Sequence, residues 1–203
     1  MSDGGTLLPV LERLFAGPRE SRLTLDAFFA GLEMRSYAFV IAALSLPNCV
    51  PTGIPLLSTV TGVPMLLLVA QAAMGRSTPT LPRFLGARTL PRGRLQDCLA
   101  RGRPHIEWLE DMVHPRREWW VRGTRRRALQ AALTVMIVVL ALPIPFDNLL
   151  PAWAILFFCL ALLERDGVMA MLGWLFTILT ALWTAFLLIV GPLVVIGLAK
   201  SLF

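Results

Sequence analysis

The sequence predicts an all-α polytopic membrane protein with two internal repeats, each combining an amphipathic surface helix with a proline-broken, re-entrant membrane segment. Three observations predict this fold. First, 56% of the 203 residues are hydrophobic, which is more apolar surface than a soluble chain of this size can cover. Second, these residues form blocks long enough to span a bilayer, such as the uncharged stretch from Val168 to Ala199. Third, prolines interrupt two of the blocks in the same pattern.

We expect a single membrane domain over residues 1–203. Its consecutive segments are 1–35 (amphipathic N-terminal helices), 36–75 (first broken membrane segment), 76–127 (arginine-rich amphipathic region), 128–166 (second broken membrane segment) and 167–203 (one or two C-terminal spans). In the first segment, apolar residues recur at helical spacing from Leu7 to Phe15 and from Leu25 to Leu32. Those two apolar faces could lie on the membrane surface or pack against the rest of the protein.

The positive charge is concentrated in residues 76–127. Thirteen of the 19 basic residues lie there, with only five acidic ones. Beside membrane spans, such a stretch indicates a cytoplasmic loop rather than a nucleic-acid surface. The three scattered cysteines form no metal-ligand or disulfide pattern, and no catalytic motif is present. We therefore expect no metal, no cofactor, no nucleic-acid partner and no enzymatic activity.

The two breaks match after a shift of 96 residues. Each has an apolar run, Leu-Pro, seven residues, Pro and a second apolar run. The helix-breaking residues are Pro47, Pro51, Gly53 and Pro55 in the first break and Pro143, Pro145 and Pro151 in the second. Backbone groups freed by such breaks cannot face lipid, so they must be buried in protein or line a watery cavity. This pattern predicts an internal duplication with discontinuous helices, either parallel or inverted, as in many transporters.

Polar side chains within the breaks are the candidate pathway for a substrate or ion. They are Asn48 and Thr52 in the first break and Asp147 and Asn148 in the second. Asp147 is the only acid between Glu118 and Glu164. If the chain turns back within the membrane, Asp147 is a proton or cation site. If residues 128–146 cross completely, Asp147 instead caps the following helix at the far interface.

A second set of charges could form a network at the membrane edge. Its members are Glu33, Arg35, Glu110, Arg165 and Asp166. The cluster at 164–167 could be a simple turn, or Arg165 and Asp166 could pair with Glu33 and Arg35. The block from residue 168 to 199 would measure about 48 Å as one helix, so it must tilt strongly or divide, with Gly191-Pro192 as the expected break.

Five motifs in order resemble the ExoD family of bacterial inner-membrane proteins. They are "LPNCVPTGIPLLSTVTGVPMLLLVAQAAMGR", "LPRFL", "LEDMVHPR", "LPIPFDNLLPAWAI" and "ERDG", and the resemblance covers roughly residues 25–190. The chain departs from it at "GLEMRS", where a Gly-Glu-Arg-Gly-like turn is expected. The resemblance implies a multi-pass protein of the bacterial inner membrane that is associated with exopolysaccharide synthesis.

Two hypotheses about function follow. In the first, the protein is a small transporter-like homodimer that moves an ion or a polar or lipid-linked solute at the paired breaks. Asp147 would titrate, and Asn48, Thr52 and Asn148 would be the polar ligands. In the second, the protein is a non-transporting scaffold in lipid that holds polysaccharide-synthesis proteins through its arginine-rich surface.

Overall fold

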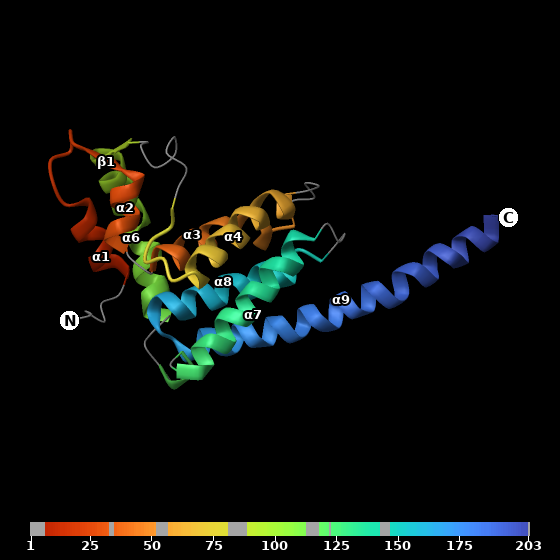
Figure 1. The fold of residues 1–203 in the computed structure, drawn as a ribbon. Helices are drawn as coiled ribbons and strands as arrows, with labels where there is room; N and C mark the ends of the chain where they lie inside the picture. Colours follow the sequence, from red (N-terminus) through yellow and green to blue (C-terminus); the bar gives the residue numbers. More distant parts are fainter. Residues whose placement is uncertain are drawn as a thin grey trace.

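The computed structural model describes residues 7–32, 35–51, 57–80, 89–112, 118–121, 123–142 and 147–202. These residues are mainly helical (Figure 1). The helices are α1 (Leu7–Phe15), α2 (Leu25–Leu32), α3 (Arg35–Ser45), α4 (Leu57–Ala73), α6 (Arg92–Met112), α7 (Gly123–Ala141), α8 (Leu149–Glu164) and α9 (Gly167–Leu202), with 3-10 turns η1 (Leu46–Cys49) and η2 (Glu118–Trp120). Two short strands, β1 (Arg22–Thr24) and β2 (Thr89–Pro91), pair antiparallel, with Leu23 opposite Leu90.

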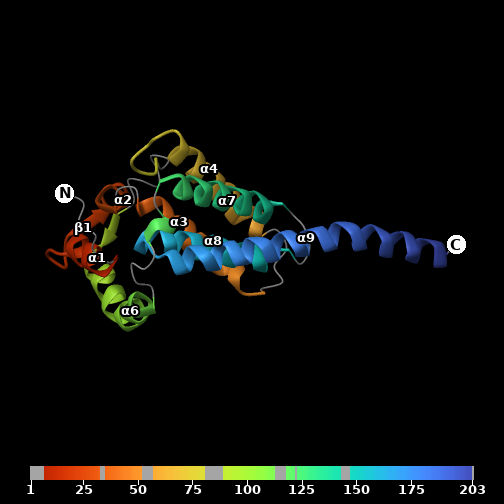
Figure 2. The ribbon, with the colours of Figure 1, turned by 90° about the horizontal axis from the view of Figure 1, so that it is seen from below.

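Two helix pairs form the central bundle. α3 is followed by α4, and α7 by α8; α3 packs on α8, and α4 packs on α7. We call the end where α3 and α7 end, and where α4 and α8 begin, the tip, and the opposite end the base (Figures 1 and 2). α3 ends at Ser45 and α7 ends at Ala141, which are 141 − 45 = 96 positions apart. The ends of α3 and α7 are therefore separated by the same 96 residues that align the two breaks in the sequence.

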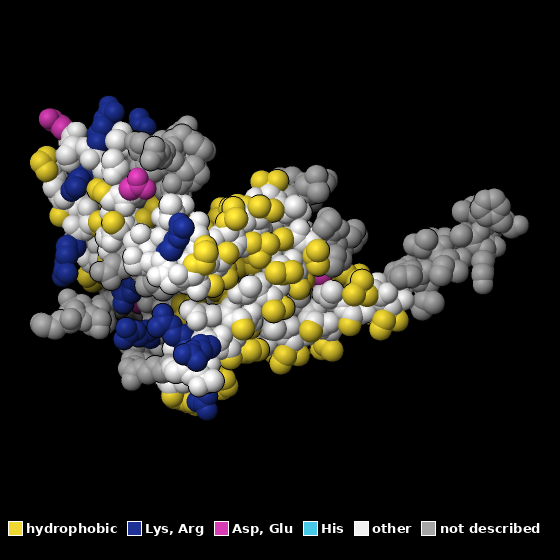
Figure 3. All heavy atoms as spheres, viewed as in Figure 1, with side chains coloured by type: hydrophobic (Ala, Val, Ile, Leu, Met, Phe, Trp, Pro, Cys, Tyr) yellow, Lys and Arg dark blue, Asp and Glu magenta, His cyan; other side chains and the backbone are white. Residues whose placement is uncertain are grey.

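Apolar residues at helical spacing build the core between these helices. α7 contributes one buried row, which packs against α4, and α8 contributes a second, which packs against α3. The largest fully buried members of the core are Met65, Leu129, Ile137, Leu140, Ile155 and Phe158. The outer faces are also apolar, since exposed valine and leucine side chains lie on α4, α7 and α9. Figure 3 shows these side chains as a continuous apolar surface over the bundle. The bundle therefore carries apolar side chains both in its core and on its outer faces.

α9 is one helix, so of the two alternatives for this block the division at Gly191-Pro192 is wrong, and strong tilt stays a prediction. Its 36 residues correspond to about 54 Å, and it extends past the tip of the bundle (Figures 1 and 2). Among the described residues, Gly167–Val190 is long and apolar enough to cross a membrane by itself, and α2 with α3 would add a second span if that bent pair is counted as one. α4 and α8 are apolar but shorter, with 17 and 16 residues.

The base carries a separate layer made of α1, α2, α6 and the two strands. The apolar faces of the amphipathic helices pack against one another, with Leu11, Phe15, Leu23 and Leu32 buried between them. Of the two alternatives for residues 1–35, the structure has the apolar faces packed within the protein. The strand pair, which the sequence pattern did not predict, connects the N-terminal region to the start of α6.

Candidate functional site

Asp147 lies at the tip, immediately before α8, and only 1% of its surface is exposed. Its Oδ2 accepts a hydrogen bond from Thr184 Oγ1 of α9 at 2.7 Å, while its Oδ1 has no hydrogen-bond partner among the described residues. The N-cap of α8 is Asn148, and its side chain makes no capping hydrogen bond. Asp147 thus contacts α9 and does not cap α8.

The residue after Asp147, Asn148, has a second hydrogen-bond acceptor without a described partner. Asn148 is half-buried, and its side-chain oxygen Oδ1 also lacks a donor within the described part of the chain. An unpaired buried polar atom costs about 1–3 kcal/mol, so native proteins keep few of them. Both unpaired atoms are acceptors. The lone pairs of these two oxygens can therefore bind a proton or a cation, or accept a hydrogen bond from a hydroxyl group.

Thr184 is the residue of this candidate site that the sequence interpretation missed. The row Gly173, Thr177, Thr180 and Thr184 indicates close helix contact. In the structure, Thr177 Oγ1 and Thr180 Oγ1 donate to carbonyls of their own helix, whereas Thr184 Oγ1 donates to Asp147. A hydroxyl row in an otherwise apolar helix was the available signal, but it did not single out this member.

The described polar side chain of the first break, Asn48, has hydrogen-bond partners. Asn48 is 5% exposed, and its Nδ2 donates to Thr61 Oγ1 at 2.9 Å and to the Leu44 carbonyl at 3.3 Å. Thr61 Oγ1 in turn donates to the Leu57 carbonyl at 3.0 Å. Asn48 therefore connects η1 to α4 through its side-chain Nδ2. Thr52 lies outside the described residues.

The two breaks contact each other at the tip. Thr59 Oγ1 of α4 donates at 3.1 Å to the carbonyl of Ala141, the last residue of α7, whose carbonyl lacks a partner within its own helix. One turn later, Gly62 lies so close to Ala141 that an added Cβ would be 2.8 Å from its Cβ and 2.9 Å from its Cα. A glycine is therefore required where the two halves meet.

Three of the seven residues named as helix-breaking lie in described parts of the chain, and all three lie between or at the ends of helices. Pro47 occupies the start of η1, which directly follows the last residue of α3, and the exposed Pro51 follows that turn. Pro151 is buried in the first turn of α8, where a proline interrupts no helical hydrogen bond. Gly53, Pro55, Pro143 and Pro145 lie outside the described residues.

The predicted charge network is only partly described. Arg165 is exposed in the left-handed conformation (φ 54°) and ends α8, so residues 164–167 form a turn. Asp166 is fully buried; its Oδ1 accepts from the Val168 backbone N–H at 2.7 Å, and its Oδ2 has no hydrogen-bond partner among the described residues. Asp166 therefore caps α9. Arg35 begins α3, Glu33 is outside the described residues, and Glu110 lies on α6 with its side chain not described.

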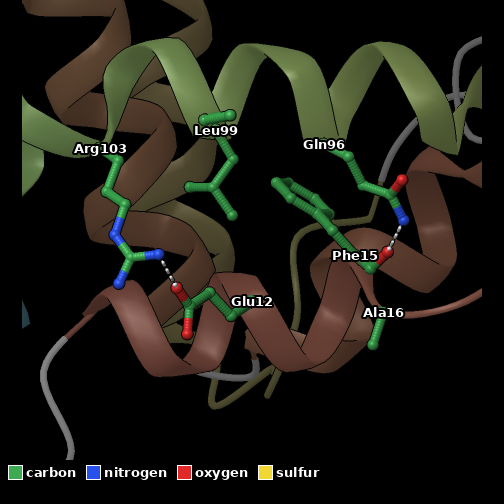
Figure 4. A pocket seen from close by; sticks show the side chains of 7 residues that line it. Glu12, Phe15, Ala16, Gln96, Leu99 and Arg103 are labelled. Carbon is green, nitrogen blue, oxygen red and sulfur yellow. Dashed lines mark hydrogen bonds and ion pairs between the residues drawn. The ribbon is translucent and has the colours of Figure 1, made fainter.

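A shallow pocket of about 230 Å³ lies between α1 and α6 at the base (Figure 4). On one side, an Arg103 nitrogen lies 3.4 Å from a Glu12 carboxylate oxygen. On the other side, Gln96 Nε2 donates to the carbonyl of Phe15 at 2.8 Å, at the end of α1. These contacts join the two helices, so the pocket follows from their packing. No group of three or more His, Cys, Asp or Glu that could hold a metal occurs in the described part of the chain.

Comparisons with known proteins give one family. A family model described as "Exopolysaccharide synthesis, ExoD" matches residues 7–186. The chain is 29% identical over 187 residues to Protein ExoD of Rhizobium meliloti (strain 1021), covering 90% of this chain and 77% of that protein. It is 30% identical over 167 residues to an uncharacterized protein of Synechocystis sp., covering 81% of this chain and 78% of that protein. No solved structure gives a significant match.

Proposed function

The chain belongs to the ExoD family, which is linked to exopolysaccharide synthesis, and on that premise we propose that it is a small transporter-like protein of the bacterial inner membrane. In this proposal it moves a proton, a small cation or a polar or lipid-linked solute across or into the membrane at the tip of the bundle. It acts without catalysing a reaction, requires no cofactor and works as a homodimer, since 203 residues are few for a transporter.

The helix lengths support a re-entrant arrangement. α8 has 16 residues and α7 has 19, or about 24 Å and 28 Å, whereas the hydrocarbon core of a bilayer is about 30 Å thick. With the base at the cytoplasmic interface, the tip therefore ends inside the lipid, and only α9 continues to the other side. The arginine side chains gather at the base and the apolar surface covers the bundle (Figure 3), as the positive-inside rule requires of this orientation.

Two features support a duplication with parallel repeats. The contacts between the two helix pairs are symmetric: the first helix of each pair packs on the second helix of the other. α3 packs on α8, and α7 packs on α4. Both helix pairs also turn at the same end of the bundle (Figure 1). Parallel repeats are the alternative in which each unit enters and returns without crossing.

The observation that carries the proposal is the buried carboxylate of Asp147 with one oxygen held by Thr184 and one unpaired. Ionisable groups at membrane depth are costly, and they mark ion or substrate pathways when they are retained. Since the unpaired oxygens of Asp147 and Asn148 only accept, the cargo at this point is a donor or a cation, not an anion.

A comparison of two threonines on α9 tests the proposal. The purified protein is placed in sealed liposomes, and proton and alkali-cation flux is followed with an internal pH dye under imposed gradients. We expect Thr184→Val to reduce flux roughly 3- to 10-fold, because a lost hydrogen bond to a buried carboxylate is worth about 1 kcal/mol or more. Thr177→Val is the matched control, since its hydroxyl bonds only to its own helix, and it should keep the wild-type rate.

Two results would contradict the proposal. One is a wild-type rate no higher than that of empty liposomes under every gradient. The other is an equal reduction by both threonine variants, because a general loosening of α9 would then explain the change.

The arginine-rich base favours a second candidate, the scaffold. Arg22, Arg94 and Arg101 are exposed on β1 and α6. In this reading R22E/R94E/R101E would abolish exopolysaccharide production in cells, and Asp147→Asn would leave it at the wild-type level. The transport proposal expects the opposite pair of results, so polysaccharide yield from the two strains separates the candidates.

A further inference from the structure

A cluster of arginine and tryptophan side chains lies at the base of the bundle, far from the tip. The guanidinium carbon of Arg125 lies 4.0 Å from the ring centre of Trp119 and 5.4 Å from that of Trp120. The two indole rings are themselves 5.0 Å apart. Arg125 therefore stacks on an aromatic pair, which holds a guanidinium group by its face and leaves its N–H edge available.

The surroundings fix this cluster at the edge of the apolar surface. Trp119 and Trp120 belong to η2, which packs against both α7 and α9, and the next residue, Val121, is buried. Trp119 is nevertheless 51% exposed. Arg125, Arg126 and Arg127 are exposed in the first turns of α7. Tryptophan and arginine side chains that lie together at the edge of an apolar surface are typical of a membrane interface.

The charge of this cluster is not balanced within the described part of the chain. Two arginines elsewhere at the base have carboxylate partners: Arg19 pairs with Asp97, and Arg103 pairs with Glu12 and Glu107. No such pair is found for Arg125, Arg126 or Arg127 among the described residues. Three neighbouring positive charges repel one another, and the free N–H groups at the start of α7 add to the positive potential. An anion is therefore the complementary partner.

We propose that Trp119, Arg125, Arg126 and Arg127 form a binding surface for the phosphate-bearing head groups of acidic phospholipids. A guanidinium group binds a phosphate with two parallel hydrogen bonds, and stacking on tryptophan holds Arg125 in position for them. The indole of Trp119 suits the boundary between head groups and acyl chains. The surface is independent of the site at the tip, and it goes beyond transport by specifying which lipid surrounds the base.

Quenching of tryptophan fluorescence by brominated lipids tests this surface. The full-length protein is reconstituted in phosphatidylcholine containing brominated phosphatidylglycerol or brominated phosphatidylcholine, and the relative association constant is measured. An arginine near an acidic membrane contributes about a fivefold preference. We expect wild type to prefer phosphatidylglycerol by about fivefold or more, and R125Q/R126Q/R127Q to lose that preference while keeping all its tryptophans.

The matched control removes the same charge elsewhere. R22Q/R94Q/R101Q changes three exposed arginines of β1 and α6 and should keep the preference. R126Q/R127Q, which leaves Arg125 on the rings, should lose only part of it and remains informative if the triple variant fails to fold. The proposal is overturned if wild type shows no preference, if the triple variant or R126Q/R127Q keeps the full preference, or if the control loses as much as the triple variant. Equal losses would mean a response to net charge only.

Discussion

Asp147→Asn is expected to lower ion flux roughly 10- to 100-fold while the protein stays folded. Interactions with a charged group contribute about 1.5–3 kcal/mol, and about 1.4 kcal/mol corresponds to a factor of ten. The amide oxygen of asparagine can still accept the hydrogen bond from Thr184, so the contact between the tip and α9 is kept. The substitution therefore removes the negative charge and the titratable proton of the side chain at position 147, and it keeps the size and shape of that side chain.

The thermal midpoint in detergent separates a functional from a structural effect. Replacing a buried carboxylate by a neutral amide removes a desolvation cost, so the midpoint should be unchanged or higher. Asp26→Asn makes the same chemical change at an exposed position on α2 and should alter neither flux nor midpoint. A variant of Asp147 that conducts like wild type would remove this carboxylate from any pathway.

Gly62→Val is expected to have the largest effect on stability. Its side chain would have to occupy space held by Ala141, including backbone atoms that cannot rotate away. Overpacking of this kind costs about 1–3 kcal/mol. Separating the two helices would also break the bond from Thr59 to the Ala141 carbonyl, leaving that carbonyl unpaired. We expect a lower thermal midpoint and a much smaller yield of monodisperse protein.

A neighbouring position is the control for this change. Val63→Ile enlarges a side chain that is 51% exposed on the same helix, so the yield and the midpoint should stay at wild-type values. If Gly62→Val melted at the wild-type temperature, the close approach of α4 and α7 would not exist in the folded protein.

The family, the helical fold and the positions of the breaks could be predicted from the sequence because they depend on local chemistry. Pro47 lies just after the end of α3 and Pro151 lies in the first turn of α8, as a proline's missing N–H donor favours. Pro64 and Pro104 lie inside helices, so a proline alone does not decide where a helix ends. The family resemblance, inferred from five ordered motifs, is confirmed by the match over residues 7–186. Asp147 could be selected because a single acid among apolar residues is conspicuous.

The rest depends on contacts between distant residues. Thr184 is 37 residues from Asp147, and nothing in the spacing separates it from Thr177, which bonds within its own helix. Asn48 was expected to offer a ligand, yet its amide is used by Leu44 and Thr61, a pairing that only the packing of α4 decides. The strand pair joins residues 22–24 to 89–91, and its short segments carry no alternation that predicts it.

The packing of α3 on α8 and of α4 on α7 also sets the order in which the protein can be made. Residues 35–73 leave the ribosome before any residue of their partner helices, and α8 is complete only at Glu164. At elongation rates of about 5–20 residues per second, the first half waits roughly 5–18 s for its counterpart. During that interval the face of the first half that will contact α7 and α8 has no partner from this chain. Thr184 emerges later still, so the acidic site is assembled only near the end of translation.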